Sequence, residues 1–319
     1  MNKTLKRSKI VALGGGTGLA NLLRGLKKYS CDITAVVAVT DDGGSSGRLR
    51  RELGILPPGD IRNCLVALSQ EENLMARLFQ YRFPAEGSLA GHSFGNLFLT
   101  AMSAITGGFD KAIYSSGEVL AISGRVLPVT LKSVTLSAGL ADGNIVDGET
   151  NISRSSSRVK TLMIKPYSPP AAPMVLDAIA EADCIIMGPG SLYTSVIANL
   201  LVEGVADAIA ASKAARVYVS NIMTQPGETS GYTIEDHISA IESHAGQNII
   251  DYIIVNDGSI PAGIAKRYAK EGSAPVKAEK KARFKARIIK ADLVGLDEYA
   301  RHNPDKLAAV IYKKILKKL

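Results

Sequence analysis

The sequence KIVALGGGTG, residues 9–18, joins a short apolar run directly to a run of glycines. The apolar run predicts a β-strand buried on both faces, as in a parallel sheet. The glycines and Thr17 predict a tight turn into a helix, whose first backbone N–H groups attract a phosphate. Leu19 and Asn21 break the GxGxxG register, and no Walker A sequence is present. A phosphate cradle is favoured over a plain tight turn.

The rest of the chain repeats this order of strand and then helix. Strands are predicted at residues 9–13, 33–40, 183–188, 216–220, 251–256 and 287–293. Helices are predicted at residues 18–28, 60–69, 94–105, 111–122, 173–181, 192–203, 234–244 and 305–318. Such alternation is typical of an α/β fold with a doubly wound, mostly parallel, Rossmann-like sheet.

Two parts of the chain depart from this alternation. Residues 125–168 contain β-rich pieces and turn signals such as Asp142-Gly143, and they predict an antiparallel excursion in the middle of the chain. The C-terminal part predicts a helical and β extension whose last helix has Asn303 as N-cap and Pro304 as first residue. We therefore predict a nucleotide-binding core over residues 1–260 and a basic extension, packed on the core, over residues 261–319.

Composition excludes several classes of protein. With 46% hydrophobic and 21% charged residues in 319, the chain is not disordered as a whole. Residues 277–319 hold 13 basic and 5 acidic residues, which accounts for the whole net charge of +8. Because the basic excess is confined to this end and carries no aromatic-basic motif, we expect no nucleic-acid partner.

The cysteines and the hydropathy pattern indicate a cytoplasmic protein. Cys31, Cys64 and Cys184 are far apart and show no zinc-ligand spacing, so reduced, buried thiols are expected. The apolar run of residues 10–13 is too short for a signal peptide. We expect no transmembrane helix.

An acidic pair follows the second predicted strand. Asp41 and Asp42 stand where Rossmann proteins hold a ribose, and two carboxylates could equally hold Mg²⁺ or a substrate hydroxyl. The alternative is that Asp42 only starts a turn. In the segment that follows, Asp60 is a plausible N-cap, and Arg62 and Asn63 could reach the same pocket from the first turn of a helix.

Further candidates lie at later loops. His92 could act as a general acid or base, although no carboxylate partner marks a Ser-His-Asp set, and Ser93 could cap the next helix. The loop at residues 188–195 is a second glycine and Ser/Thr anion site before a helix. A polar segment starting at Asn221 follows the next strand. One pocket for a phosphorylated, hydroxyl-rich ligand would explain these loops together.

The segments GGGTG, TDDGGSSGRLR, PPGDIRN, GHSFGN, MGPGSLYTSVI and NIMTQPGET resemble the CofD-like superfamily over roughly residues 8–260. The superfamily's namesake is a 2-phospho-L-lactate transferase, which uses Mg²⁺ and releases a guanosine nucleotide. The sequence is most similar to the bacterial YvcK/GlmR branch, the gluconeogenesis factors. This resemblance implies a regulator that binds UDP-N-acetylglucosamine and links carbon supply to cell-wall precursor synthesis and cell shape.

The resemblance also implies roles for residues. Gly15, Gly16, Thr17 and the 188–193 loop would bind a nucleotide diphosphate, and Asp41, Asp42 and Asn221 would face the sugar or second substrate. The C-terminal residues Arg267, Tyr268 and Arg301 would add to nucleotide recognition. The full set of ligand-binding candidates is Gly14, Gly15, Gly16, Thr17, Gly18, Asp41, Asp42, Arg62, Asn63, Asn96, Gly188, Pro189, Gly190, Ser191, Leu192, Tyr193, Asn221, Arg267, Tyr268 and Arg301.

Three functions stay open at this point. The first is a nucleotide-sugar-binding regulator without a required cofactor, whose partners are a UDP-sugar, a protein of amino-sugar or cell-wall synthesis, and a second copy of the chain. The second is a Mg²⁺-dependent transferase of phosphate-linked groups, with Asp41, Asp42 and His92 as catalytic candidates and Mg²⁺ at the acidic pair. The third is an NAD-binding Rossmann protein, which the glycine register disfavours.

Overall fold

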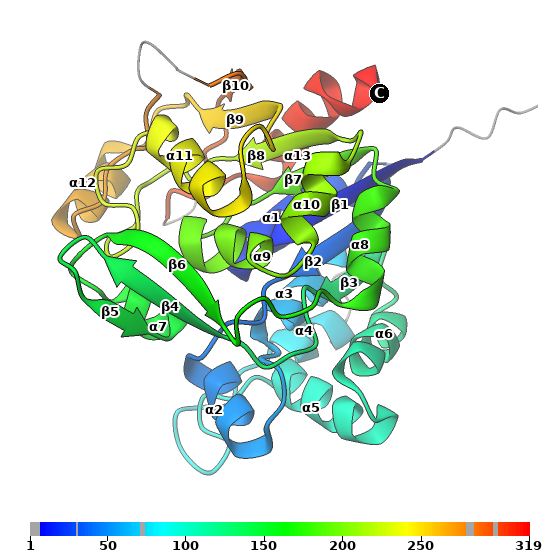
Figure 1. The fold of residues 1–319 in the computed structure, drawn as a ribbon. Helices are drawn as coiled ribbons and strands as arrows, with labels where there is room; N and C mark the ends of the chain where they lie inside the picture. Colours follow the sequence, from blue (N-terminus) through cyan, green and yellow to red (C-terminus); the bar gives the residue numbers. More distant parts are fainter. Residues whose placement is uncertain (1–6, 30, 71–73, 279–283, 296–298) are drawn as a thin grey trace, which may run out of the picture.

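A seven-stranded sheet forms the centre of the computed structural model, with a small three-stranded sheet beside it (Figure 1). The structure describes residues 7–29, 31–70, 74–278, 284–295 and 299–319. All pairs in the large sheet are parallel, in the order β10-β9-β8-β7-β1-β2-β3. The bounds of these strands are β1 Ser8–Gly14, β2 Cys31–Val37, β3 Arg125–Pro128, β7 Cys184–Met187, β8 Ala215–Val219, β9 Tyr252–Asn256 and β10 Arg287–Ala291.

Strand β1 lies between two halves of the sheet that wind in opposite directions. The first half of the chain adds β2 and β3 on one side, and the second half adds β7 to β10 on the other. The register pairs Ile10 with Ile33 of β2 and with Cys184 of β7. This order confirms the doubly wound parallel sheet and creates a topological switch point between β1 and β7, where such sheets bind ligands.

Helices cover both faces of the large sheet. Helices α1, α3 and α13 lie on one face, and α8 to α11 lie on the other (Figure 1). Helix α1 buries Leu19, Leu22, Leu23 and Leu26, an apolar stripe at helical spacing. The helix bounds are α1 Gly16–Leu26, α2 Gly44–Leu53, α3 Gly59–Leu68, α4 Leu74–Gln80, α5 Phe94–Thr106, α6 Phe109–Val119, α7 Glu149–Ser153, α8 Pro173–Ala180, α9 Ala198–Leu200, α10 Val205–Ala211, α11 Ile234–Ala245, α12 Ala262–Lys270 and α13 Pro304–Lys314, with a π-helix η1 Leu192–Ile197 and a 3₁₀-helix η2 Leu316–Lys318.

The middle of the chain forms the small antiparallel sheet, with one exception. Strands β4 Thr135–Leu140, β5 Ile145–Asp147 and β6 Val159–Lys165 pair in the order β5-β4-β6. Residues 125–128 instead form β3, which pairs parallel to β2. The predicted excursion was therefore wrong at its beginning. Because β3 is an edge strand, Pro128 deprives no further strand of a hydrogen bond.

The C-terminal part of the chain contacts both the sheet and the first helix. Strand β10 pairs with β9, so residues 287–291 extend the large sheet; the predicted boundary at residue 260 stays a prediction. Helix α13 begins as predicted, because the Asn303 Oδ1 atom accepts from the N–H groups of Asp305 and Lys306 at 3.0 Å. Helix α13 packs on α1 so closely that a Cβ atom at Gly25 would overlap the carbonyl oxygen of Pro304.

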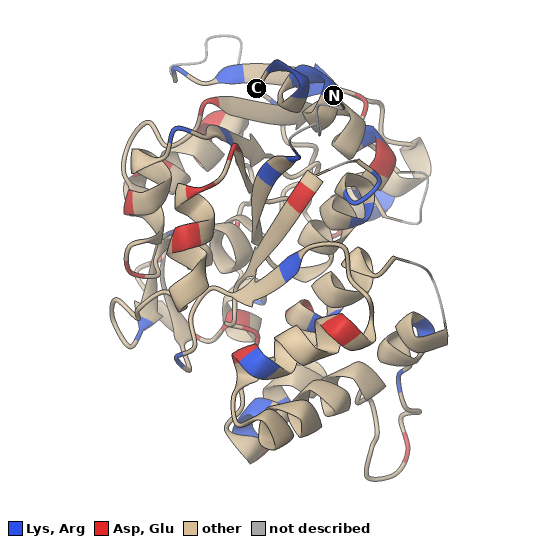
Figure 2. Ribbon diagram, turned by 90° about the vertical axis from the view of Figure 1, so that its right-hand side faces the viewer, with Lys and Arg blue, Asp and Glu red and all other residues tan. Residues whose placement is uncertain are grey.

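The described residues show where the basic side chains gather and whether any helix could cross a membrane. Lys and Arg residues gather on β10 and near the C-terminus (Figure 2). They include Arg287, Lys290, Lys313 and Lys314, whereas residues 279–283, part of the basic stretch noted in the sequence, lie outside the described residues. No helix formed by the described residues is both long and apolar enough to cross a membrane.

Candidate functional site

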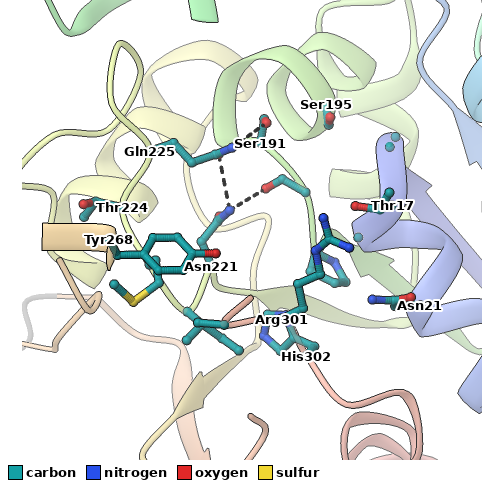
Figure 3. A pocket seen from close by; sticks show the side chains of 18 residues that line it. Thr17, Asn21, Ser191, Ser195, Asn221, Thr224, Gln225, Tyr268, Arg301 and His302 are labelled. Atoms are coloured by element: carbon teal, nitrogen blue, oxygen red, sulfur yellow. Dashed lines mark hydrogen bonds between the residues drawn. The ribbon is translucent and has the colours of Figure 1, made fainter. Parts of the chain in front are cut away.

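A cavity of about 290 Å³ opens at the switch point (Figure 3). Three loops build it, at the carboxyl ends of β1, β7 and β8, and the C-terminal part of the chain closes it. Of the residues proposed from sequence, the cavity brings together Gly15, Gly16, Thr17, Gly18, Pro189, Gly190, Ser191, Asn221, Tyr268 and Arg301. The cavity therefore joins segments that are almost 300 residues apart in the chain.

The two glycine loops are packed directly against each other. A Cβ atom on Gly18 would lie 2.5 Å from the backbone oxygen of Pro189, so only glycine lets α1 approach the second loop this closely. A Cβ on Gly15 would lie 2.9 Å from Asp60 Oδ2 and 3.2 Å from Ser195 Oγ. The glycines thus serve contacts within the protein as well as access for a ligand.

A carboxylate of the protein occupies the first amide of α1. Asp60 Oδ2 accepts a hydrogen bond from the Gly16 N–H at 2.5 Å. The predicted N-cap role of Asp60 is wrong, because α3 begins at Gly59 after Pro58 and Asp60 turns toward the glycine loop. Burial raises the pKa of Asp60 to about 6, against the stabilising effect of the Gly16 N–H.

A second buried carboxylate sits at the start of η1. Glu228 is 1% exposed and accepts hydrogen bonds from the backbone N–H groups of Tyr193 and Thr194 and from the Ser153 hydroxyl. Burial raises the pKa of Glu228. The N-termini of α1 and η1, which follow the two glycine loops, therefore each bind a carboxylate of the protein. A ligand phosphate would bind the remaining amides and hydroxyls around Thr17 and Ser191.

A chain of side-chain amides fixes the loop after β8. Asn221 Nδ2 donates to the Gly190 carbonyl oxygen at 2.9 Å and lies 3.5 Å from Gln225 Oε1. Gln225 Nε2 in turn donates to Ser191 Oγ at 3.0 Å. These bonds tie the β8 loop to the second glycine loop and orient both amides at the cavity wall (Figure 3).

The C-terminal part supplies the cation and the aromatic ring of the cavity. In Figure 3 the Arg301 side chain extends toward Thr17 and Asn21 of α1, while Tyr268 lies on the side of Asn221 and Thr224. Tyr268 packs with a small apolar cluster that includes Ile222, Met223 and Ala300. One end of the cavity is therefore cationic and rich in backbone amides, and the other is apolar.

The cavity also includes residues that the sequence analysis missed. They are Asn21, Ser195, Ile222, Met223, Thr224, Gln225, Ala300 and His302. Asn21 follows the glycine loop by about one helical turn and could have been found from that spacing. His302 carried no signal of its own, because no glycine loop or strand end adjoins it and its approach to the cavity depends on tertiary packing.

The acidic pair lies in a neighbouring cluster and not among the cavity residues. Asp42 Oδ1 accepts from the Thr150 N–H at 2.9 Å and from the Thr150 hydroxyl at 2.5 Å, which ties the β2 loop to α7. Asp41 Oδ1 accepts from the Gly43 N–H at 2.9 Å, the bond of a local turn. Asp60 connects this cluster to the cavity. Its carboxylate accepts a hydrogen bond from the Gly16 N–H, and the nearby charge of Asp41 contributes to the rise in the Asp60 pKa.

His92 and Arg62 belong to a buried network of hydrogen bonds beside Asp41 and Asp42. His92 Nδ1 lies 2.9 Å from Ser45 Oγ, and burial lowers the His92 pKa. Arg62 donates to Ser93, to Asn96 Oδ1 at 2.9 Å and to Asn63 Oδ1 at 2.8 Å. Ser93 caps α5 as predicted, by accepting from the Asn96 N–H. The structure gathers these candidates, but with one another and not with the glycine loops.

The remaining candidates lie behind or beside the cavity wall. Leu192 and Tyr193 are buried in η1, and the Tyr193 hydroxyl hydrogen-bonds to Tyr232 at 2.8 Å. Gly14 and Gly188 end or follow the central strands and are not among the lining residues. Arg267 is also absent from the lining, whereas its neighbour Tyr268 is part of it.

The carboxylates near the cavity offer an incomplete set of metal ligands. Glu149 is a half-buried carboxylate near Asp41 and Asp60; it accepts from the Thr40 hydroxyl at 2.6 Å, and desolvation raises its pKa well above the ordinary value. Within the described ranges, no three His, Cys, Asp or Glu residues are grouped in a way that could hold a metal ion. An Mg²⁺ ion would therefore need phosphate oxygens and water besides Asp41, as Mg²⁺ commonly does.

Comparisons with known proteins agree with one another. The family model described as 2-phospho-L-lactate transferase CofD matches residues 10–294. A relative from Nostoc sp. is 55% identical over 310 residues, which is 96% of this chain and 68% of the relative. The gluconeogenesis factor of Bacillus subtilis is 46% identical over 309 residues, covering 96% of this chain and 98% of the relative. A crystal structure of a Bacillus halodurans protein, 46% identical, matches with a TM-score of 0.93 over 97% of this chain and 100% of that one.

Proposed function

Since this chain belongs to the CofD family and to its gluconeogenesis-factor branch, we propose that it is a regulatory protein that binds UDP-N-acetylglucosamine in the switch-point cavity. The ligand state would report the supply of amino-sugar precursors and so link carbon metabolism to cell-wall synthesis and cell shape. The protein partner would be an enzyme of amino-sugar or cell-wall synthesis.

One observation carries this proposal. Arg301 extends toward the N-terminus of α1, so a diphosphate placed between them meets a cation, the Thr17 hydroxyl and the positive end of a helix. The apolar end, with Tyr268 and Met223, suits a nucleobase or a sugar ring. The polar wall formed by Ser191, Asn221 and Gln225 suits hydroxyl groups.

The transferase alternative has less support from the arrangement of side chains. Its catalytic candidates Asp41, Asp42 and His92 are outside the cavity lining, and Asp42 is engaged by Thr150. We propose that ligand binding requires no resident cofactor, and that any Mg²⁺ would join Asp41 and the ligand's phosphates. The NAD-binding alternative rests only on the place of the acidic pair after β2.

The test is calorimetric titration and thermal unfolding of the wild-type protein with UDP-N-acetylglucosamine, GDP, NAD⁺ and NADH, each with and without Mg²⁺. A ligand at about 100 times its Kd stabilises the folded state by about 2.7 kcal/mol, which a thermal shift detects readily. A response to the UDP-sugar supports the proposal. A response only to GDP with Mg²⁺ favours the transferase, and one only to NAD⁺ or NADH favours the third function.

A matched pair of variants locates the binding site. We expect Arg301→Gln to weaken binding of the UDP-sugar at least tenfold, because it removes the one cation that lines the cavity among the described residues. Lys270→Gln removes an exposed positive charge from the same part of the chain but not from the cavity wall, and should bind as the wild type does. Equal losses in the two variants would indicate a general charge effect and contradict the proposed site.

A further inference from the structure

Asn221 presents a hydrogen-bond acceptor with no protein donor at the wall of the cavity. Its Nδ2 atom is engaged by the Gly190 carbonyl oxygen, which can only accept, so the amide orientation is determined and Oδ1 must face the other way. Among the described residues, no group donates a hydrogen bond to this buried Oδ1 atom. Buried side-chain oxygens in folded proteins are usually paired.

His302 presents a second acceptor at the same wall. The residue is 8% exposed, and its ring hydrogen-bonds to the backbone of Ser220, the residue before Asn221. The Ser220 N–H donates to Ile254, so the group that His302 meets is the Ser220 carbonyl oxygen, which requires an imidazole N–H. Burial lowers the pKa of His302 to about 4, and the neutral ring therefore keeps a lone pair on Nε2.

The setting of His302 separates it from the other histidines. His244 Nε2 accepts from the Leu162 N–H at 2.9 Å and is satisfied within the protein. His237 has the same bonding pattern as His302, with Nδ1 on the Thr233 carbonyl oxygen and no protein partner for Nε2 among the described residues, but it lies in α11 and lines no part of the cavity. Only at His302 does a second unpaired acceptor, Asn221 Oδ1, line the same cavity.

We propose that His302 Nε2 and Asn221 Oδ1 accept hydrogen bonds from the nucleoside part of the ligand and make His302 a specificity-determining residue. The inference rests on the proposed function. Asn221 lies beside Tyr268, which packs with the apolar cluster of Ile222, Met223 and Ala300, whereas Arg301 extends toward the glycine loop (Figure 3). The bond to the Ser220 backbone holds the His302 ring next to Asn221. The matching ligand chemistry is a hydrogen-bond donor, and in a uridine nucleotide we assign it to either the ribose 2′-hydroxyl or the N3–H of the base.

The test crosses a change in the protein with a change in the ligand. Titrations measure the Kd of wild type and His302→Phe for UDP-N-acetylglucosamine, for its 2′-deoxyuridine counterpart and for its N3-methyluridine counterpart. We expect His302→Phe to weaken binding of the parent ligand about tenfold or more, because a donor would be buried without its acceptor. The analogue that lacks the donor should bind the wild type more weakly than the parent ligand does, and should bind His302→Phe as well as the parent ligand does. Which analogue behaves in this way identifies the donor as ribose or base.

Controls keep the outcomes distinct. His302→Gln retains an oxygen acceptor and should recover part of the affinity, while His237→Phe replaces a similarly buried histidine outside the cavity and should bind as wild type. Unchanged affinity in His302→Phe overturns the inference alone, as does a wild type indifferent to both analogues. The latter needs no folded variant. A wild type that binds none of these UDP-sugars overturns the proposed function and the inference with it.

Discussion

Asp60 is the residue whose environment differs most from what its sequence position suggests. Its half-buried carboxylate lies behind the glycine loop and accepts from one backbone N–H, with Asp41 as a nearby like charge. Since a buried carboxylate is costly to ionise, its pKa in the folded protein rises from 3.8 to about 6. The folded protein consequently binds a proton more tightly at this site than the unfolded chain does.

The pH dependence of stability should reveal this residue. Because the folded pKa is the higher one, Asp60 lowers the unfolding free energy as pH rises from about 4 to 6, and the loss persists above pH 6. The rise in the Asp60 pKa from 3.8 to about 6 corresponds to about 3 kcal/mol. Asp60→Asn keeps an oxygen for the Gly16 N–H, so we expect it to be more stable than wild type at pH 8 and to lose that advantage near pH 4.

Urea unfolding between pH 4 and 8 measures this difference. Asp177→Asn is the matched control, because Asp177 is an exposed carboxylate on α8. We expect no comparable trend with pH for that variant. A difference between Asp60→Asn and wild type that stays constant over the whole range would mean that Asp60 is not protonated on folding.

At the scale of elements, the contact between α1 and α13 depends on Gly25. Alanine normally stabilises a helix by about 1 kcal/mol relative to glycine. At Gly25 the added Cβ atom would overlap Pro304 and crowd Ala308, so the two helices would have to separate. We expect Gly25→Ala to lower the unfolding free energy by about 1–3 kcal/mol, which thermal or chemical unfolding can measure.

Gly263 in α12 provides the opposite case. Nothing lies within 4 Å of a Cβ atom built at this position. Gly263→Ala should therefore leave stability unchanged or raise it by up to about 1 kcal/mol. If both alanine variants behaved alike, helix propensity would dominate and the close approach to Pro304 would carry no energetic weight.

Most elements could be predicted from the sequence where hydrophobic periodicity is strong. The central strands and helices such as α1 and α11 were predicted to within a few residues. Helix α2 was missed because GSSGRLRREL has six polar or charged residues against two leucines, of which only Leu49 is buried. Residues 125–128 were misassigned because four residues show too little pattern to distinguish an edge strand of one sheet from the start of another.

At the scale of the whole molecule, the cavity depends on segments from both ends of the chain. The glycine loop after β1 faces Arg301 and His302 across it. Hydrogen exchange with and without UDP-N-acetylglucosamine should therefore show joint protection near residues 14–18, 188–191, 221–225 and 299–302. The hairpin of α5 and α6, which contributes no lining residue, should exchange at an unchanged rate. Protection confined to one segment would contradict a ligand bound between them.

The same geometry explains how much of the site was accessible from sequence. Glycine loops after strands have local signatures, and residues such as Gly15, Gly18 and Gly190 were therefore predicted to bind a ligand and do line the cavity. The acidic pair was expected in the same pocket, yet it packs with Thr150 and Gly43 in an adjoining cluster. His302 is brought to the cavity by the packing of the C-terminal part, which no local pattern records.

The packing of α13 on α1 has a consequence for the folding of the nascent chain. A chain emerging from the ribosome presents α1 about 280 residues before α13, the helix that packs on it at Gly25. Strand β1 likewise has one unpaired edge until β7, some 170 residues further along the chain, has been synthesised. We infer that the nascent protein carries α1 without its partner helix while the residues between α1 and α13 are translated, a state that favours chaperone association.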